Sequence, residues 1–226
     1  MALVICLAIA LVATALTARA LMTLRLARAD LERARAEYAL DGAQLSASLV
    51  VLEQTGSGRL RWAMQAADET YDVLAEPEAL KLNAAALLVG DDAALSALGA
   101  PDPDQMRGRL KRASQDASLS EDEVACAAPT PAWRDCAGSA ISSYGQADKP
   151  LVPAPIVPTF PTDLTQGSRA GEIWRIRVSD RLGWTDDRIV RLTGQADHPT
   201  VMLDHRFFRR AKGGDLCDRI LASLAG

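Results

Sequence analysis

An uninterrupted helical segment opens this chain and restricts the folds that it can adopt. From Ala2 to Gln54 there is no proline and only one glycine, Gly42. Because proline and glycine are the residues that most disfavour a helix interior, the segment predicts one continuous helix. At about 1.5 Å per residue such a helix would be about 80 Å long. A small domain cannot bury that length, so we expect a rod that projects from a domain, a shape typical of proteins that assemble.

The first third of the predicted helix is almost wholly apolar. Ala2 to Ala18 contains two polar side chains, and after Arg19 the apolar residues resume as far as Leu24. A membrane span usually needs about 20 apolar residues, and this segment reaches that length if the Arg19 side chain extends to the lipid headgroups. We therefore expect residues 1–24 to be a transmembrane segment. The alternatives are a cleavable secretory signal, which would need a basic start, and a buried core helix.

Residues 25–56, the amphipathic extension of the same helix, continue a seven-residue apolar repeat. The repeat runs through Leu24, Leu31, Tyr38, Leu45 and Leu52, with Ala27, Ala34 and Leu49 on the same face. Heptad spacing is typical of a seam that packs against other helices. We expect the second half of the seam to pack against the chain's own domain and the first half to meet lipid or other subunits. The predicted helix–helix assembly face comprises Leu3, Leu7, Leu11, Leu24, Leu31, Tyr38 and Leu45.

The distribution of basic residues bears on orientation. Five arginines follow the apolar run between Arg19 and Arg35, and no basic residue precedes it. The positive-inside rule would leave the rest of the chain in the cytoplasm. We predict the opposite, because the chain opens directly on its apolar segment, as it would after loss of a short basic leader. The expectation is a single-pass protein of the bacterial inner membrane with its globular domain in the periplasm.

Composition limits the partners. The net charge of −4 and the two histidines give no basic surface for nucleic acid, so we expect no nucleic-acid partner. Cys126 and Cys136 lie in a proline-containing stretch, where they could form a local disulfide in an oxidising compartment. The disulfide connectivity does not follow from the spacing of the cysteines, and Cys217 would be left without a disulfide partner.

Turn and strand signals divide the rest of the chain. Residues 57–144 hold the first strands, near Leu60–Met64 and Tyr71–Leu74, and then a short helical insert. In that insert Asp102-Pro103-Asp104-Gln105 resembles a capping box with proline at the first helical position. Asn83 and Ser120 are further candidate helix starts. Residues 145–167 contain five prolines and predict an extended linker.

The clearest strand pattern lies in residues 168–226. Trp174, Ile176 and Val178 alternate with Arg175 and Arg177, and a similar alternation follows at residues 188–192. The two runs predict an antiparallel hairpin across Gly183 and Trp184, with a third strand at residues 200–208 and helical turns near residues 215–224. The expected fold class is therefore α+β, with a long N-terminal membrane-spanning helix packed on one small antiparallel sheet.

These motifs, in this order, resemble a known family. The N-terminal part of the chain is similar to the type IV pilin-like proteins. The similarity lies in the apolar helix and in two motifs that follow it, Ala36-Glu-Tyr38-Ala-Leu40-Asp-Gly42-Ala43 and Glu76-Pro-Glu78-Ala-Leu80-Lys81-Leu82-Asn83. With the two C-terminal strand runs, the chain resembles more particularly the K-type minor pseudopilins of type II secretion systems. The resemblance covers residues 1–90 and 168–210. It implies a pilin-like fold and a structural subunit at the tip of the pseudopilus.

One agreement and two departures accompany the resemblance. Major pseudopilins carry a glutamate near the start of the apolar segment, whereas this stretch has Ile5 and no acid, as K-type members do. A carboxylate in lipid needs a partner, so its absence suits a tip position. The family usually bears a large helical insertion, and residues 91–145 are short for it. The family also implies calcium, but Glu121, Asp122 and Glu123 are consecutive, a spacing that favours a helix start over a ligand loop.

Catalytic and metal-binding patterns are weak. His198 and His205 are the only histidines, and neither accompanies a nucleophile motif. Cys126, Cys136 and a histidine lack the close ligand pairs of a zinc site, and there is no glycine-rich phosphate loop. We expect no enzyme, no metal and no cofactor.

The predicted function is that of a minor pseudopilin of the type II secretion system, a tip subunit that nucleates pseudopilus assembly and helps to export folded proteins. The implied partners are other minor pseudopilins, the pseudopilus, the inner membrane and, if a leader is present, the prepilin peptidase. One alternative is a minor pilin of a type IV or competence pilus, which gene neighbourhood would separate. The other is a membrane-anchored periplasmic binding protein, which would be a monomer with a ligand pocket.

Overall fold

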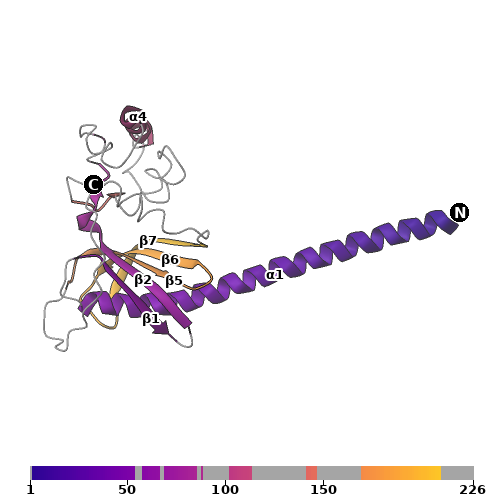
Figure 1. Ribbon diagram of the computed structural model, residues 1–226, viewed down its shortest axis with the longest axis horizontal. Coiled ribbons are helices and arrows are strands. Elements are labelled where there is room, and N and C mark those ends of the chain that lie inside the picture. Colours follow the sequence, from indigo (N-terminus) through magenta and orange to yellow (C-terminus); the bar gives the residue numbers. More distant parts are fainter. Residues whose placement is uncertain are drawn as a thin grey trace.

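The computed structural model is a long helix whose C-terminal third packs on a small sheet (Figure 1). It describes residues 2–53, 58–66, 69–85, 88, 102–113, 141–146 and 169–209, and in the helix it leaves out the side chains of residues 2, 3 and 6–11. Helix α1 spans Ala2–Glu53. The predicted single helix is therefore confirmed, and Figure 1 shows its N-terminal part projecting far from the rest of the molecule.

Five strands form the main sheet, in the order β1-β2-β5-β6-β7, and every neighbouring pair is antiparallel. Their bounds are Leu60–Ala66 for β1, Glu69–Pro77 for β2, Ile173–Ser179 for β5, Trp184–Leu192 for β6 and Thr200–Arg209 for β7. The pairing of β2 with β5 joins two strands that lie about a hundred residues apart in the sequence, with Val73 opposite Val178 and Glu76 opposite Arg175. The predicted α+β class, with a long helix on one small antiparallel sheet, is confirmed.

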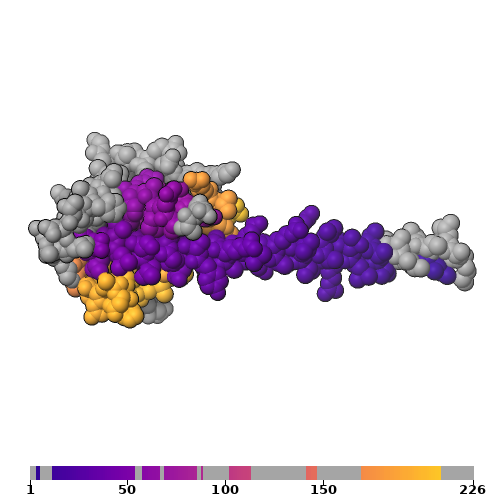
Figure 2. Space-filling view, turned by 90° about the horizontal axis from the view of Figure 1, so that it is seen from below, coloured from indigo at the N-terminus to yellow at the C-terminus, as the bar shows by residue number. Residues whose placement is uncertain are grey.

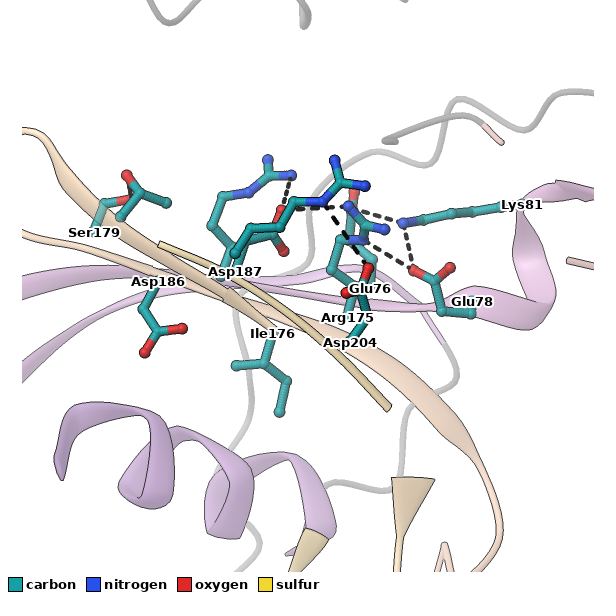
Figure 3. Close-up of polar contacts among 12 residues, drawn as sticks. Glu76, Glu78, Lys81, Arg175, Ile176, Ser179, Asp186, Asp187 and Asp204 are labelled. Carbon is teal, nitrogen blue, oxygen red and sulfur yellow. Dashed lines mark hydrogen bonds and ion pairs between the residues drawn. The ribbon is translucent and has the colours of Figure 1, made fainter. Parts of the chain in front are cut away.

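Alternation along the strands decides which side chains face α1. Trp174, Ile176 and Val178 of β5 are fully buried in the hydrophobic core, which also includes Val73 and Ala75 of β2. Successive strand residues point to opposite faces, so Arg175 and Arg177 belong to the other face of the sheet. We call it the outer face. Figure 3 shows Ile176 and Asp186 directed toward the helix below the sheet, and the side chains of Arg175 and Lys81 above it.

Helix α1 meets the sheet through apolar side chains, two of which are alanines. Leu40, Ala43, Ala47 and Val51 recur every three or four residues and are completely buried. This is the spacing of one helix face, and the two alanines allow the helix backbone to approach the strands closely. Between them, the Gln44 side chain lies in the interface, and its Nε2 donates to the carbonyls of two strands, as described below.

The hairpin β5–β6 forms as the alternation predicts, with a tighter turn. Trp184 belongs to β6, so the connection is Asp180–Gly183. Gly183 has a φ of 87°, a left-handed conformation that glycine adopts without steric cost. The Asp180 carboxylate accepts from the Trp184 backbone N–H at 2.8 Å, which closes the turn.

The insert retains a short two-stranded sheet and one helix among the described residues. Strand β3 (Leu82–Asn83) pairs in parallel with β4 (Ile141–Ser142), and the 3₁₀ turn η1 (Glu78–Leu80) precedes β3. Helix α4 spans Pro103–Ala113. Its predicted N-cap is confirmed, because the Asp102 carboxylate accepts from the Gln105 backbone N–H at 2.9 Å.

Close packing at Gly145 holds the two short strands in place. A Cβ at this position would lie 2.4 Å from the Lys81 carbonyl oxygen and 2.7 Å from that of Leu82. The Asn83 side chain donates to the Gly145 carbonyl at 2.9 Å. Only a residue without a side chain fits this approach between two backbone segments.

Several predictions lie outside the described residues and stay predictions. They are the side chains of Leu3, Leu7 and Leu11, the Cys126–Cys136 pair, the helix start at Ser120, the acidic run Glu121–Glu123, most of the proline-rich linker and the turns near residues 215–224. The Asn83 carboxamide oxygen does accept from the Ala85 backbone N–H at 2.8 Å, so this residue closes a local turn.

The prediction of a single-pass inner membrane protein is wrong. Within the part of the chain that the structure describes, no helix contains a stretch long and apolar enough to cross a membrane. The physical reason lies in the arginines of α1: between Val12 and Glu53, Arg19, Arg25 and Arg28 interrupt the apolar residues within three turns. A membrane span tolerates few charged side chains because each is costly to remove from water.

Candidate assembly interface

The predicted seam of α1 is solvent-exposed along its described length. The exposed fractions of its residues are 49% for Leu24, 51% for Leu31, 83% for Tyr38 and 54% for Leu45. Large apolar side chains with this exposure, repeated every seven residues along one helix, form a continuous stripe and not isolated surface residues. The structure thus brings the four described seam residues onto one uncovered face.

The seam and the sheet lie on opposite sides of α1. Tyr38 is two residues before the buried Leu40, and Leu45 is two residues from both Ala43 and Ala47. Two residues correspond to a rotation of about 200° around a helix, so these side chains point away from the sheet. Figure 2, seen from below the molecule, shows α1 lying along the surface of the domain with one side uncovered.

This placement corrects the expectation that the second half of the seam packs on the chain's own domain. Tyr38 and Leu45 remain exposed although the sheet lies beside them. Near the end of the helix Leu49 and Leu52 are partly buried, and Leu52 packs against the core. The domain instead uses a second apolar face, formed by small residues. Sequence reasoning missed that face because alanines give a weaker periodic signal than leucines.

Polar contacts fix how α1 lies on the sheet. The Gln44 Nε2 donates to the Ile176 carbonyl at 2.9 Å and to the Asp186 carbonyl at 3.0 Å, so one buried amide joins the helix to β5 and β6. At the rim, the Arg188 guanidinium donates to Asp41 at 2.7 Å and to the buried Asp186 carboxylate at 2.7 Å. A helix held by both apolar packing and directed hydrogen bonds has one rotational setting, which keeps the seam facing outward.

An aromatic and cationic stack braces α1 where it leaves the domain. The Arg33 guanidinium lies 5.8 Å from the ring centre of Phe207 in β7. Phe207 stacks on Trp184 with ring centres 5.2 Å apart, and Arg209 lies 5.6 Å from the Trp184 ring. Cations over aromatic faces are attracted by the ring quadrupole. The stack therefore resists tilting of the projecting part of α1; sequence reasoning missed it, since its members are far apart in the chain.

The outer face of the sheet holds a network of buried charges (Figure 3). The ion network, as we name it, comprises Arg59, Glu76, Glu78, Lys81, Arg175, Arg177 and Asp187. Its shortest contacts are Lys81 Nζ to Glu78 Oε1 at 2.6 Å and Arg59 Nε to Glu76 Oε1 at 2.8 Å. It joins β2, β5, β6 and the residue that precedes β1 to the 3₁₀ turn that leads into the insert.

Electrostatics within the ion network favour its charged carboxylates. Burial alone would raise the pKa of Asp187, but Arg177 and Arg175, at 3.1 Å and 3.3 Å, outweigh burial and lower the pKa far below its ordinary value. The pKa of Glu78 is lowered in the same way, against its burial, by Lys81 and Arg175. The Lys81 pKa is also lowered, because burial and the like charge of Arg175 exceed the attraction of Glu78.

The ion network is built for structure. Its charges are paired with one another inside the protein, and it fixes the insert on the sheet. Breaking a buried ion pair leaves an uncompensated charge, so such a network specifies one arrangement of the strands. The alternation at Arg175 and Arg177 indicated a polar face, but no local pattern indicated that this face is buried.

The two histidines, which were the candidate catalytic residues, occupy ordinary positions. The His205 Nε2 lies 3.1 Å from the Asp186 carboxylate, which Arg188 also contacts, so this aspartate serves the packing of β6, β7 and α1. His198 lies in an exposed turn. Within the described residues, no group of three or more histidine, cysteine, aspartate or glutamate side chains could hold a metal ion.

Comparisons with family models, with curated proteins and with solved structures found no match for this chain.

Proposed function

We propose that this chain is a structural subunit of a pilin-like filament, namely a minor pseudopilin of a type II secretion system, whose helix packs beside those of neighbouring subunits. One observation carries the proposal: α1 exposes a heptad stripe on the side opposite its own domain, from Leu24 to Leu45. Burying such a stripe against other helices removes apolar surface from water and is favourable. The domain would then sit at one end of the filament.

Two further features support this proposal. The resemblance of the helix and strand motifs to K-type minor pseudopilins implies the position at the tip, where the subunit nucleates assembly and helps to export folded proteins. The brace formed by Arg33, Phe207, Trp184 and Arg209 keeps the helix and the domain in a fixed relation, as a filament subunit that transmits a push requires. Neither feature suits a ligand-binding or catalytic role.

Charge reversal of the seam tests the proposal. The variant Leu31→Glu/Tyr38→Glu, co-expressed with the other minor pseudopilins of its secretion system, should lose co-purification with them, because charged side chains cannot be buried in the helix–helix contact. Leu26→Glu is the matched control, since Leu26 is equally exposed but lies on another side of α1. It should co-purify normally. Retained co-purification of the seam variant would contradict the proposal.

A further inference from the structure

The seam of α1 is flanked by opposite charges on its two sides. In the heptad that begins at Leu24, Arg28 and Arg35 occupy the fifth position and Asp30 and Glu37 the seventh. These two positions border the seam of a coiled coil and meet the partner helix. One border of the stripe is therefore basic and the other is acidic.

These border residues are available to a partner. Arg28, Asp30, Arg35 and Glu37 are all exposed. Among the residues that the structure describes, none of the four takes part in a hydrogen bond or ion pair. By contrast, nearby Asp41, which falls on the seam itself, is engaged by Arg188 at 2.7 Å. The uninterrupted apolar part of the seam thus ends at about Tyr38, and Leu45 lies beyond Asp41.

The charge pattern distinguishes two ways of pairing identical helices. In a parallel pair, the seventh position of one helix faces the fifth position of the next heptad on the other, so Asp30 meets Arg35 on both sides. In an antiparallel pair, seventh meets seventh and fifth meets fifth, which would oppose like charges. Like charges across a helix contact are unfavourable, so the pattern is self-complementary only in the parallel arrangement.

The position of the domain leaves room for such a pair. The sheet covers the face of α1 that carries Leu40 and Ala47, opposite the seam. Two copies joined along their seams would therefore place their domains on the two outer sides. The uncovered side of α1 in Figure 2 continues from the projecting part of the helix onto the domain.

We propose that two copies of this chain pair in parallel and in register along the seam between Leu24 and Tyr38, with Asp30 of each copy facing Arg35 of the other. The inference shares the seam with the proposed function and goes beyond it, because it names a second copy as the occupant of this face when other subunits are absent. The paired segment is only about two heptads long, and short helices contribute little stability, so the pair is weak and exchangeable.

Single cysteines test the register. Ala27 and Ala34 occupy the fourth heptad position, in the seam, and Ala29 lies on another side of the helix. In purified full-length chain under mild oxidation, Ala27→Cys and Ala34→Cys should each form a covalent dimer, since like positions approach within disulfide distance only in a parallel pair in register. Ala29→Cys is the matched control and should not exceed the unsubstituted chain, which reports cross-links of the native cysteines.

The other outcomes would overturn the inference. An antiparallel pair centred between the two alanines would cross-link a mixture of Ala27→Cys and Ala34→Cys, but neither variant alone. Equal cross-linking of all three variants would indicate random collision, and none above background would indicate a monomer. Circular dichroism of each variant establishes that the fold is kept.

Charge exchange tests the role of the borders. Asp30→Arg alone and Arg35→Asp alone should each weaken dimerisation about tenfold by analytical ultracentrifugation, and the double variant Asp30→Arg/Arg35→Asp should restore it. A double variant as weak as the singles would overturn the assignment of these contacts. If the chain dimerises but does not co-purify with other subunits, the proposed function alone is contradicted. If it co-purifies with them but does not dimerise, this inference alone is contradicted.

Discussion

The outer face of the sheet and the exposed side of α1 carry the same charged residue types, but these are buried and paired on the sheet and exposed on the helix. On the sheet, Glu78, Arg175 and Asp187 are buried and paired within 3.3 Å of an opposite charge. On the helix, Asp30 and Arg35 point into solvent beside a stripe of leucines. The first region has completed its interactions within the chain, whereas the second has not. The difference teaches that charge alone does not mark a binding surface; the absence of an internal partner does.

Removing a carboxylate should change the free energy of unfolding far more on the outer face of the sheet than on the exposed side of α1, and this is the largest expected difference. Asp187→Ala leaves the buried Arg175 and Arg177 without their partner and should lower the free energy of unfolding by about 3–5 kcal/mol, measured by urea denaturation. Asp30→Ala, the matched control on α1, should change it by less than about 0.5 kcal/mol. Equal effects of the two substitutions would show that the ion network is not a structural element.

Substitution of one leucine on each face of α1 should show which face is buried. Leu40→Ala should cost about 2–5 kcal/mol of unfolding free energy, because Leu40 is completely buried against the sheet. Leu45→Ala, only five residues along the helix, should cost less than about 0.5 kcal/mol at a protein concentration low enough to keep the chain monomeric. A large loss at Leu45 would mean that the seam is covered within the chain itself.

Acid should weaken the ion network selectively. The pKa values of Glu78 and Asp187 are lowered in the folded protein, so these carboxylates stabilise it above their unfolded pKa of about 4. That stability is lost as the pH falls through the folded values. Urea denaturation at a series of pH values should show a steep decline below about pH 4, and a shallower one for Glu78→Gln. A free energy of unfolding that stays constant down to pH 3 would contradict this account.

Replacing glycine by alanine at two positions should change the stability of the protein in opposite directions. Gly145→Ala forces a methyl group against backbone carbonyls at 2.4 Å and should destabilise the protein by about 1–3 kcal/mol. Gly42→Ala meets nothing within 4 Å on the exposed side of α1 and should stabilise the helix by about 0.5–1 kcal/mol. Thermal unfolding followed by circular dichroism measures both, and destabilisation at Gly42 would show that this side of the helix is crowded.

Much of the fold follows from local patterns in the sequence. The absence of proline gives α1, and the alternation around Trp174 gives β5 together with the face that it buries. Asp102 and Pro103 give the start of α4. Each of these signals is contained within a few neighbouring residues, where backbone preference and capping act directly. The seam was likewise visible as a heptad repeat, although its exposure beside the domain was not.

Contacts between distant residues were not predictable in this way. Arg175 is a polar strand residue in the sequence, and only the pairing of β2 with β5 brings it to Glu78. The aromatic stack of Trp184 and Phe207 likewise depends on β6 lying beside β7. Periodicity states which residues share a face, but the burial of that face depends on what else in the chain packs upon it.

The sequence by itself determined that a long helix carries a seven-residue apolar stripe and that a small sheet follows it, because helix continuity and residue periodicity are local properties of the chain. The tertiary structure decided which side of the helix packs against the chain's own sheet. Leu40 and Ala47 pack on the sheet, and Tyr38 and Leu45 do not. The physical reason is that alanine-rich packing and the buried amide of Gln44 allow the closer approach, which leaves the larger side chains of the seam exposed to solvent.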